Sequence, residues 1–195
     1  MKVYSFFLKR VFDILLALIA LIFLFPILLL VSVFIKMDTK GSFFYIKERV
    51  GKNEKLFKFY KFRTMTDRDR SQYKQVFEGD SEITKVGSVL RRTKIDELPQ
   101  LLNVLKGDMS IIGPRPCLPN MKERFGVDWK DRFGVKPGLS SLAAVKGSIY
   151  LSFEEKGYWD KYYVDNLSFF MDIKIILKTI RIVLMGEKKL FKRND

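Results

Sequence analysis

One apolar segment constrains the fold of this chain more than any other feature. Residues 14–31, ILLALIALIFLFPILLLV, contain no polar side chain, and a helix of about 20 apolar residues is what the hydrocarbon core of a bilayer requires. A secretory signal peptide is a weaker interpretation, because the run exceeds the usual apolar region of a signal peptide and no small-residue cleavage site follows it. The segment therefore predicts a membrane anchor.

Two details of this segment leave the form of the anchor open. Pro26 removes one helix hydrogen bond and kinks a helix. Basic residues flank both ends, so the positive-inside rule gives no clear orientation; they are Lys2, Lys9, Arg10, Lys36 and Lys40. A simple span and a re-entrant helix, which enters and leaves by the same face, both fit. In a re-entrant helix, Asp13 would lie near the head groups rather than in hydrocarbon, where a charge is costly.

The composition limits the classes of function. The chain has 195 residues, enough for one modest domain with a core. Its 36 Lys and Arg against 22 Asp and Glu give a net charge of +14, which attracts nucleic acid, anionic lipid or phosphorylated substrates. The absence of histidine excludes His-based acid–base catalysis, Ser-His-Asp triads and His-ligated zinc. A single cysteine, Cys117, allows no internal disulfide and fits a reducing compartment.

Residues 42–65, SFFYIKERVGKNEKLFKFYKFRTM, predict two short aromatic strands around a turn at 50–53, a β-hairpin. Lysines and arginines alternate with aromatic residues along it. This alternation suits single-stranded nucleic acid, a membrane interface, or half-buried strands with solvated lysines, which is the commonest case. After it, we expect a polar loop with some helix over 67–80 and a short helix over 81–90.

The C-terminal part predicts a loop and an amphipathic helix. Residues 132–140, RFGVKPGLS, read as a loop with a turn at Pro137-Gly138. Residues 166–185 place apolar side chains on one helix face and basic ones mostly elsewhere. Core packing and a position in the membrane interface both explain this helix. The apolar face comprises Phe169, Phe170, Ile173, Ile176, Leu177, Ile180 and Leu184.

Two adjacent acids, Asp96 and Glu97, begin a further predicted helix. Leucines recur at helical spacing over 96–105, Thr93 is the expected N-cap, and Gly107 ends the helix. Acids in a first turn interact favourably with the helix dipole, which is a purely structural explanation of the pair.

The same position also allows chemistry. A helix N-terminus binds phosphate, and an ionised carboxylate there can attack phosphorus. The neighbouring carboxylate can hold Mg²⁺, since consecutive helix residues point about 100° apart. Arg115 stands between two prolines, and a guanidinium on stiff backbone matches a phosphate bidentately.

With these motifs the sequence resembles the bacterial sugar transferases, or monotopic phosphoglycosyl transferases, which start glycan assembly on a polyprenol carrier. The motifs follow the family's order over nearly the whole chain, and the chain is similar to the small members. They are KRVFDILLALIALIFLFPILLL (9–30), FKFYKFRTM (57–65), DELPQLLNVLKGDMSIIGPRP (96–116), KPGLS (136–140) and YWDKYYVDNLS (158–168).

The resemblance implies a reaction and a set of site residues. A UDP-sugar gives its phosphosugar to polyprenyl (undecaprenyl) phosphate, with UMP as the second product, by a ping-pong route through a covalent phosphosugar on Asp96. Glu97 is the expected ligand of the cofactor Mg²⁺. Phosphate and substrate binding are expected at Lys61, Arg63, Arg91, Arg115 and Asp160.

The resemblance also implies a fold and a location. We expect an α/β-like, mostly helical monotopic membrane protein with a re-entrant helix broken at Pro26, a short β-hairpin and amphipathic interfacial helices. Residues 1–37 form the anchor, and residues 38–195 form a catalytic domain on the cytoplasmic face of the bacterial inner membrane. The expected partners are the UDP-sugar, the polyprenyl phosphate and membrane lipids, with a homodimer and downstream glycosyltransferases as further candidates; nucleic acid is not expected.

Three positions depart from the family's pattern. Phe25 stands where a serine commonly precedes the proline, and a serine hydroxyl can bond backbone groups freed at a kink. Ala144 and Ser148 replace a glutamine and an arginine, which affects donor recognition if that loop contacts the nucleotide-sugar. A membrane-tethered nucleic-acid binder and a non-catalytic scaffold are the rival functions. The binder leaves the acid pair and the Pro-Arg-Pro motif unexplained, and the intact acid pair argues against the scaffold.

Overall fold

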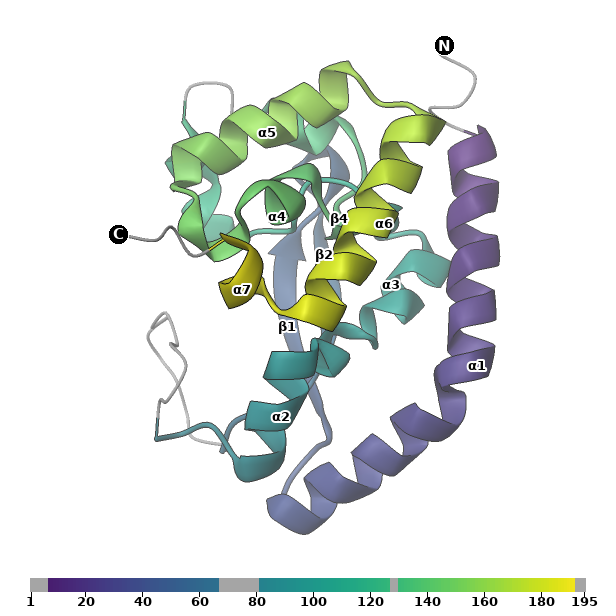
Figure 1. Cartoon of the computed structure of the whole chain (residues 1–195), viewed down its shortest axis with the longest axis vertical. Coiled ribbons are helices and arrows are strands. Elements are labelled where there is room, and N and C mark those ends of the chain that lie inside the picture. Colours follow the sequence, from purple (N-terminus) through teal and green to yellow (C-terminus); the bar gives the residue numbers. More distant parts are fainter. Residues whose placement is uncertain (1–6, 67–80, 127–129, 192–195) are drawn as a thin grey trace.

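The computed structural model describes residues 7–66, 81–126 and 130–191, and the predicted loop over 67–80 lies outside them (Figure 1). The helices are α1 (Lys9–Asp38), α2 (Lys85–Thr93), α3 (Gln100–Lys106), α4 (Leu142–Lys146), α5 (Phe153–Asp165), α6 (Phe169–Met185) and α7 (Glu187–Phe191). The strands are β1 (Phe44–Val50), β2 (Leu56–Phe62), β3 (Ser110–Ile112) and β4 (Gly138–Ser140), and short 3₁₀ turns cover Lys52–Glu54, Ile95–Glu97, Pro119–Phe125, Asp131–Gly134 and Ser148–Tyr150. The predicted mostly helical fold with a short hairpin is confirmed.

The apolar segment forms α1, a helix of 30 residues with Pro26 inside it. Figure 1 shows that α1 bends along its length and runs down one side of the molecule. Proline has no N–H, so the carbonyl of Ile22 loses its helical donor and the helix can bend there. Among the described residues, α1 is the one helix long and apolar enough to cross a membrane, and most of its apolar window is not buried in protein.

Both ends of α1 are fastened to the rest of the protein by polar contacts. Near the start, Arg10 donates to the carbonyl oxygens of Val104 and Leu105 (2.6 and 2.9 Å) at the end of α3. At the other end, the backbone N–H of Val86 donates to Asp38 (3.1 Å) at the start of α2. The two ends of α1 therefore contact one and the same domain.

Asp13, expected near the head groups, is enclosed by protein at the start of α1, and its depth in the membrane stays a prediction. Its carboxylate is buried and accepts a hydrogen bond from the backbone N–H of Ile111 (3.0 Å) in β3. A buried backbone donor requires an acceptor, and Asp13 supplies it. Lys9 and Asp172 lie beside it, with the Lys9 ammonium 2.6 Å from the Asp172 carboxylate.

The predicted hairpin is confirmed. Strands β1 and β2 pair antiparallel, with Phe44 opposite Phe62 and Val50 opposite Leu56. Phe59 and Phe62 are buried, in agreement with half-buried strands. At the turn the backbone of Asn53 is left-handed (φ 54°), a conformation that asparagine tolerates better than most residues.

The loop predicted over 132–140 is wrong at its C-terminal end, where β4 pairs parallel with β3. The turn predicted at Pro137-Gly138 is instead the start of this strand. A Cβ on Gly138 would lie 2.1 Å from the backbone nitrogen of Gly113, so the close approach requires glycine. This small sheet brings the segment that carries Arg115 beside the residues that follow Gly138.

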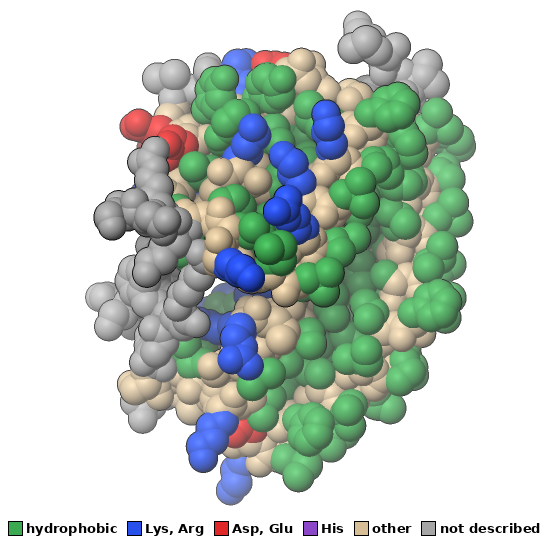
Figure 2. Space-filling model, viewed as in Figure 1, with side chains coloured by type: hydrophobic (Ala, Val, Ile, Leu, Met, Phe, Trp, Pro, Cys, Tyr) green, Lys and Arg blue, Asp and Glu red, His purple; other side chains and the backbone are tan. Residues whose placement is uncertain are grey.

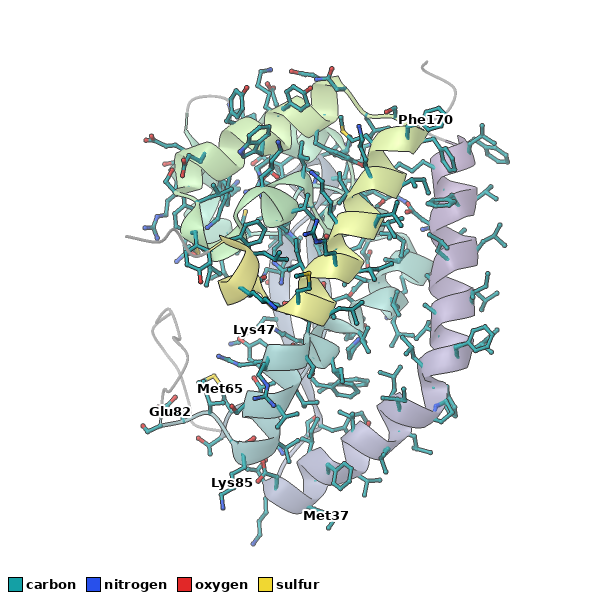
Figure 3. All side chains as sticks on the ribbon, viewed as in Figure 1. Met37, Lys47, Met65, Glu82, Lys85 and Phe170 are labelled. Atoms are coloured by element: carbon teal, nitrogen blue, oxygen red, sulfur yellow. The ribbon has the colours of Figure 1, made fainter. Side chains whose placement is uncertain are left out.

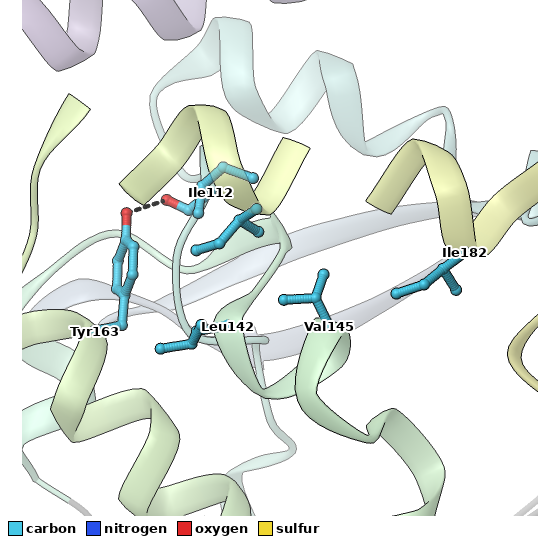
Figure 4. Packing of buried hydrophobic residues seen from close by; sticks show 6 residues of the cluster. Ile112, Leu142, Val145, Tyr163 and Ile182 are labelled. Atoms are coloured by element: carbon cyan, nitrogen blue, oxygen red, sulfur yellow. Dashed lines mark hydrogen bonds between the residues drawn. The ribbon is translucent and has the colours of Figure 1, made fainter. Parts of the chain in front are cut away.

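The C-terminal helices enclose a core around β3. Its buried members are Ile112, Leu142, Val145, Tyr163, Ile175 and Ile182, most of them visible in Figure 4. The Tyr163 hydroxyl lies within hydrogen-bonding distance of the Ile112 carbonyl oxygen (3.1 Å) and of the Asp172 carboxylate (2.7 Å). Asp172 thereby connects α5, α6 and the start of α1.

The apolar face predicted for residues 166–185 points outward on α6. Ile175 and Ile182, on the opposite side, are buried in the core, whereas Phe170 and Leu184 are among the most exposed side chains. In Figure 2 hydrophobic side chains cover the edge formed by α1 and continue inward, while Lys and Arg gather near the middle of the face. Phe170 and Met37 lie near opposite ends of this region (Figure 3). A continuous exposed apolar surface of this kind marks an interaction site, such as a membrane.

Candidate active site

The acid pair lies in a turn between two helices. The expected Thr93 cap is wrong: Thr93 ends α2, and its hydroxyl donates back to the carbonyl oxygens of Val89 and Leu90. Lys94 then adopts a left-handed conformation (φ 60°), which stops the helix, and Asp96 and Glu97 form a 3₁₀ turn before α3. The predicted helix over 96–105 is therefore shorter than expected, although Gly107 ends it as predicted.

This geometry weakens the purely structural explanation of the acids. Because the regular helix α3 starts only at Gln100, neither acid lies in its first turn, where a helix dipole acts most strongly.

The helix predicted over 81–90 is also displaced, to Lys85–Thr93, because the Thr84 side chain caps it by accepting from the Gly87 N–H. Helix α2 thus runs up to the acid pair.

Asp96 is buried with one of its oxygens engaged. Its side chain is only 1% exposed, and Oδ2 lies 2.6 Å from the Lys61 ammonium. The other oxygen, Oδ1, has no hydrogen-bond partner within the described part of the chain. Burial raises the pKa of Asp96, while the positive charge of Lys61 acts to lower it. Burying a carboxylate oxygen without a partner lowers the stability of the folded protein, and such a group calls for a functional explanation.

The pKa of Glu97 is shifted in the opposite direction to that of Asp96. Burial acts to raise its pKa, but the positive charges of Arg115 and Lys61 outweigh burial and hold the pKa well below its usual range. Arg115 donates to Glu97 Oε1, and the Lys61 ammonium lies 3.4 Å from the same oxygen. Environments that push the pKa values of two neighbouring acids apart indicate separate roles.

Arg115 is held in place by its backbone. Arg132 donates to the Arg115 carbonyl oxygen (2.6 Å), and prolines on both sides restrict the chain. The Arg115 side chain is nevertheless 46% exposed, so a ligand can reach it. The structure therefore brings together four of the predicted site residues: Lys61, Asp96, Glu97 and Arg115.

A cavity of about 310 Å³ lies beside Arg115, which forms part of its lining. Asp160 lines it and pairs with the buried Arg132, whose guanidinium is 3.0 Å away. Burial raises the pKa of Asp160 to about 6, against the positive charges of Arg132 and Lys156. Ala144 and Ser148, two of the positions that depart from the family's pattern, also line the cavity.

Two predicted phosphate-binding residues contact other groups. Arg63 is buried and donates to the carbonyl oxygens of Thr39 and Lys40 after α1. Arg91 donates to the Thr64 hydroxyl (2.9 Å) and lies 3.0 Å from the Met65 sulfur. None of these contacts involves the acid pair, and phosphate binding by Arg63 and Arg91 stays a prediction.

The sequence analysis missed three polar residues at this site. Arg132 lies in a segment without periodicity, so no local signal points to it. Gln100, the first residue of α3 after the acid turn, is buried, and its amide has no hydrogen-bond partner within the described residues. Lys94 directly precedes the turn that carries the acids, and no sequence pattern sets it apart from the other lysines of this basic chain.

The comparisons with known proteins agree with these motifs. Residues 4–186 match the bacterial sugar transferase family. The chain belongs to this family. It is 41% identical over 180 residues to the uncharacterized sugar transferase EpsL of Bacillus subtilis (strain 168), covering 92% of this chain and 89% of EpsL.

Two further relatives indicate the range of this family. The UDP-N-acetylgalactosamine-undecaprenyl-phosphate N-acetylgalactosaminephosphotransferase of Aeromonas hydrophila is 40% identical over 189 residues, which cover 92% of this chain and 44% of that protein. The exopolysaccharide production protein ExoY of Sinorhizobium fredii (strain NBRC 101917 / NGR234) is 37% identical over 194 residues, which cover 91% of this chain and 86% of ExoY. The chain thus spans most of two of these relatives and less than half of the third.

Proposed function

We propose that this protein transfers a phosphosugar from a UDP-sugar to polyprenyl phosphate, giving polyprenyl-diphosphate-sugar and UMP. The observation that carries the proposal is the buried Asp96 carboxylate, with one oxygen paired to Lys61 and the other without a partner. The name of the Aeromonas relative describes a reaction of this class. The reaction would be the first membrane step in the assembly of a polysaccharide or other glycan.

The proposed reaction has two displacements at one phosphorus atom. Asp96 Oδ1 attacks the phosphorus that carries the sugar, an O–P bond forms, and the bond from that phosphorus to the bridging oxygen breaks, so UMP leaves with the electron pair. An oxygen of the polyprenyl phosphate then attacks the same phosphorus. The acyl-phosphate bond breaks, and the Asp96 carboxylate is restored.

The neighbouring cations support this chemistry. Lys61 fixes Oδ2 of Asp96 and favours its ionised, nucleophilic form. Arg115 is exposed enough to bind a phosphate, and a guanidinium suits phosphate geometry. A carboxylate nucleophile needs no imidazole to activate it, in keeping with a sequence that has no histidine.

The residues present fit a bound Mg²⁺. This ion prefers oxygen ligands, and it is usually held by one or two carboxylates together with substrate phosphates. Glu97 is ionised and Asp96 Oδ1 is unpartnered, while the described residues contain no group of three or more His, Cys, Asp or Glu side chains able to hold a metal by themselves. We propose Glu97 as its protein ligand; Mg²⁺ would neutralise charge on the diphosphate.

We also propose that α1 is re-entrant and that the domain lies on the cytoplasmic face. The support is that both ends of α1 contact the same domain, through Arg10 at one end and Asp38 at the other. A simple span would place these ends on opposite sides of the bilayer. The outward apolar face of α6 would rest in the interface beside α1.

Nucleotide release and protein mass test the reaction. Purified protein is incubated with Mg²⁺, undecaprenyl phosphate and a panel of UDP-sugars, and we expect UMP release with at least one donor. With donor alone, the intact mass should rise by one phosphosugar in the wild type but not in Asp96→Asn. Lys52→Ala, at the hairpin turn, is the control and should keep most activity. Release of UDP instead of UMP, or a mass increase in Asp96→Asn, would contradict the mechanism.

A further inference from the structure

A carboxylate from the C-terminal helix reaches the region of the acid pair. Glu187, the first residue of α7, has its Oε1 atom 3.2 Å from the Lys94 ammonium, and the Ser148 hydroxyl donates to the same oxygen (3.0 Å). Lys94 immediately precedes the turn of the acids, and Ser148 lines the cavity beside Arg115. One side chain therefore connects α7, the acid turn and the cavity wall.

The backbone at Gly186 and the packing of α7 place Glu187 beside Lys94. Gly186 has a left-handed backbone (φ 82°) that turns the chain from α6 into α7. Leu190 and Phe191 then pack against the core cluster that contains Val145 and Ile182. Figure 1 shows the short helix α7 folded back beside the lower end of α6 and below α4. The position of Glu187 is thus set by apolar packing rather than by its ion pair alone.

Lys94 is positioned to meet an anion at this site. Its side chain is 40% exposed, against 18% for Glu187, so a ligand can reach the ammonium. Its charge acts to lower the pKa of both acids, as that of Lys61 does, although burial keeps the pKa of Asp96 raised. The charge of Glu187 also acts on Arg115. Glu187 is therefore a negative charge paired with Lys94, close to the turn that carries the carboxylate proposed to react.

We propose that Lys94 is a further phosphate-binding residue for the donor diphosphate, and that Glu187 occupies Lys94 between substrates. Helix α7 then acts as a gate whose carboxylate must give up its partner when the diphosphate binds. This inference rests on the proposed function. A diphosphate carries more negative charge than one carboxylate, so it competes successfully for the ammonium, but part of its binding energy is spent on displacing Glu187.

Two substitutions separate the parts of the gate. Glu187→Gln removes the charge and keeps a side chain that can accept from Ser148, so Lys94 is free for the diphosphate and the Kd for UDP should fall about fivefold. Lys94→Met removes the cation and keeps the apolar stem, so the Kd for UDP and the KM for the UDP-sugar should rise about tenfold while kcat changes little.

The double variant tests whether the two residues act on each other. If Glu187 acts by occupying Lys94, then Glu187→Gln has no effect on UDP binding in the Lys94→Met background, and the two changes are non-additive. Glu54→Gln is the matched control, because it also removes a carboxylate that is paired with a lysine. The Glu54 carboxylate, at the hairpin turn, lies 2.6 Å from the Lys122 ammonium. UDP affinity should be unchanged in this control.

Calorimetric titration of the full-length protein with UDP measures the Kd of each variant in the absence of turnover. If UDP binds the wild type and neither Glu187→Gln nor Lys94→Met changes Kd by more than twofold, the gate is wrong and the proposed reaction stands. If Glu187→Gln weakens UDP binding together with a lower Tm, Glu187 is a structural strap and the gate is again wrong. If the wild type does not bind UDP at all, the proposed function fails together with the gate.

Discussion

At the scale of single residues, the two adjacent acids differ because their neighbours differ. Burial dominates at Asp96 and raises its pKa, whereas Arg115 and Lys61 together dominate at Glu97 and lower its pKa. The proposed nucleophile therefore loses its charge first as the pH falls, while Glu97 stays ionised. Loss of UMP release at acidic pH should accordingly report the protonation of Asp96.

This difference gives a prediction for Lys61→Met. Activity should fall at every pH, because Asp96 loses the cation that fixes it. The acid limb of kcat/KM should also move to higher pH, since Lys61 acts to lower the pKa of Asp96 in the wild type. The measurement is kcat/KM for UMP release as a function of pH, with Lys52→Ala as the control. An acid limb that stays in place in Lys61→Met would show that Asp96 does not set it.

Asp160 gives a second prediction, for stability. Its folded pKa of about 6 lies above its ordinary value of 3.8, so the stability it contributes is present below the ordinary pKa and is lost as the pH rises through about 6. Asp160→Asn is neutral throughout this range. Between pH 4 and pH 7, the difference in Tm should therefore shift in favour of the variant. Thermal unfolding of both proteins measures this, and a difference independent of pH would refute the assignment.

The sequence carried the identity of the site residues better than their geometry. The resemblance to the family named Lys61, Asp96, Glu97 and Arg115, and the structure brings these four side chains together. Arg63, only two residues beyond Lys61, diverges because β2 ends at Phe62 and the arginine turns to the end of α1. Such a choice depends on which carbonyl groups lie nearby in the folded chain, and no local pattern reports that.

At the scale of elements, local periodicity predicted what local forces determine. The hairpin, the long apolar helix and the helix near the C-terminus follow from residues close in sequence. The parallel pairing of β3 with β4 joins segments separated by the loops and turns after Arg115, and a three-residue strand carries too short a pattern to be recognised. The apolar face of α6 was also visible, but only the packed structure reveals that it points outward.

Helix α2 offers a prediction at this scale, because it leads directly into the acid turn. A Cβ on Gly87 would lie 2.0 Å from the carbonyl oxygen of Thr64, so Gly87→Ala must push α2 away from the segment after β2. We expect a loss of about 2 kcal/mol in unfolding free energy and a strong fall in UMP release. Gly134→Ala is the matched control, since its Cβ would meet no atom within 4 Å. Equal Tm and activity in the two variants would show that α2 does not position the acids.

At the scale of the whole molecule, the arrangement of α1 links charge, membrane and site. Lys9, Asp13 and Asp172 form a buried polar cluster at one end of the helix, and Asp38 contacts α2 at the other. One side of the apolar middle of α1, around Ala17 and Leu21, packs against the core near Val104, and the other side, around Ile22 and Phe23, is exposed. With a net charge of +14, such a protein is attracted to anionic head groups. In the proposed function this attraction would bring the acid pair to the surface where a polyprenyl phosphate presents its head.

This arrangement predicts where the ends of α1 lie in a membrane. Phe7 and Met37 lie at the two ends of α1 and are 73% and 77% exposed, so Phe7→Cys and Met37→Cys should both react with a membrane-impermeant maleimide. A re-entrant helix makes both cysteines react from the side on which Glu154→Cys, an exposed position of the domain, also reacts. Wild-type protein gives the background, because Cys117 is buried. Labelling of Phe7→Cys and Met37→Cys from opposite sides of sealed vesicles would instead establish a simple span. In that case the contacts of Arg10 and Asp38 with the same domain could not both exist in the membrane.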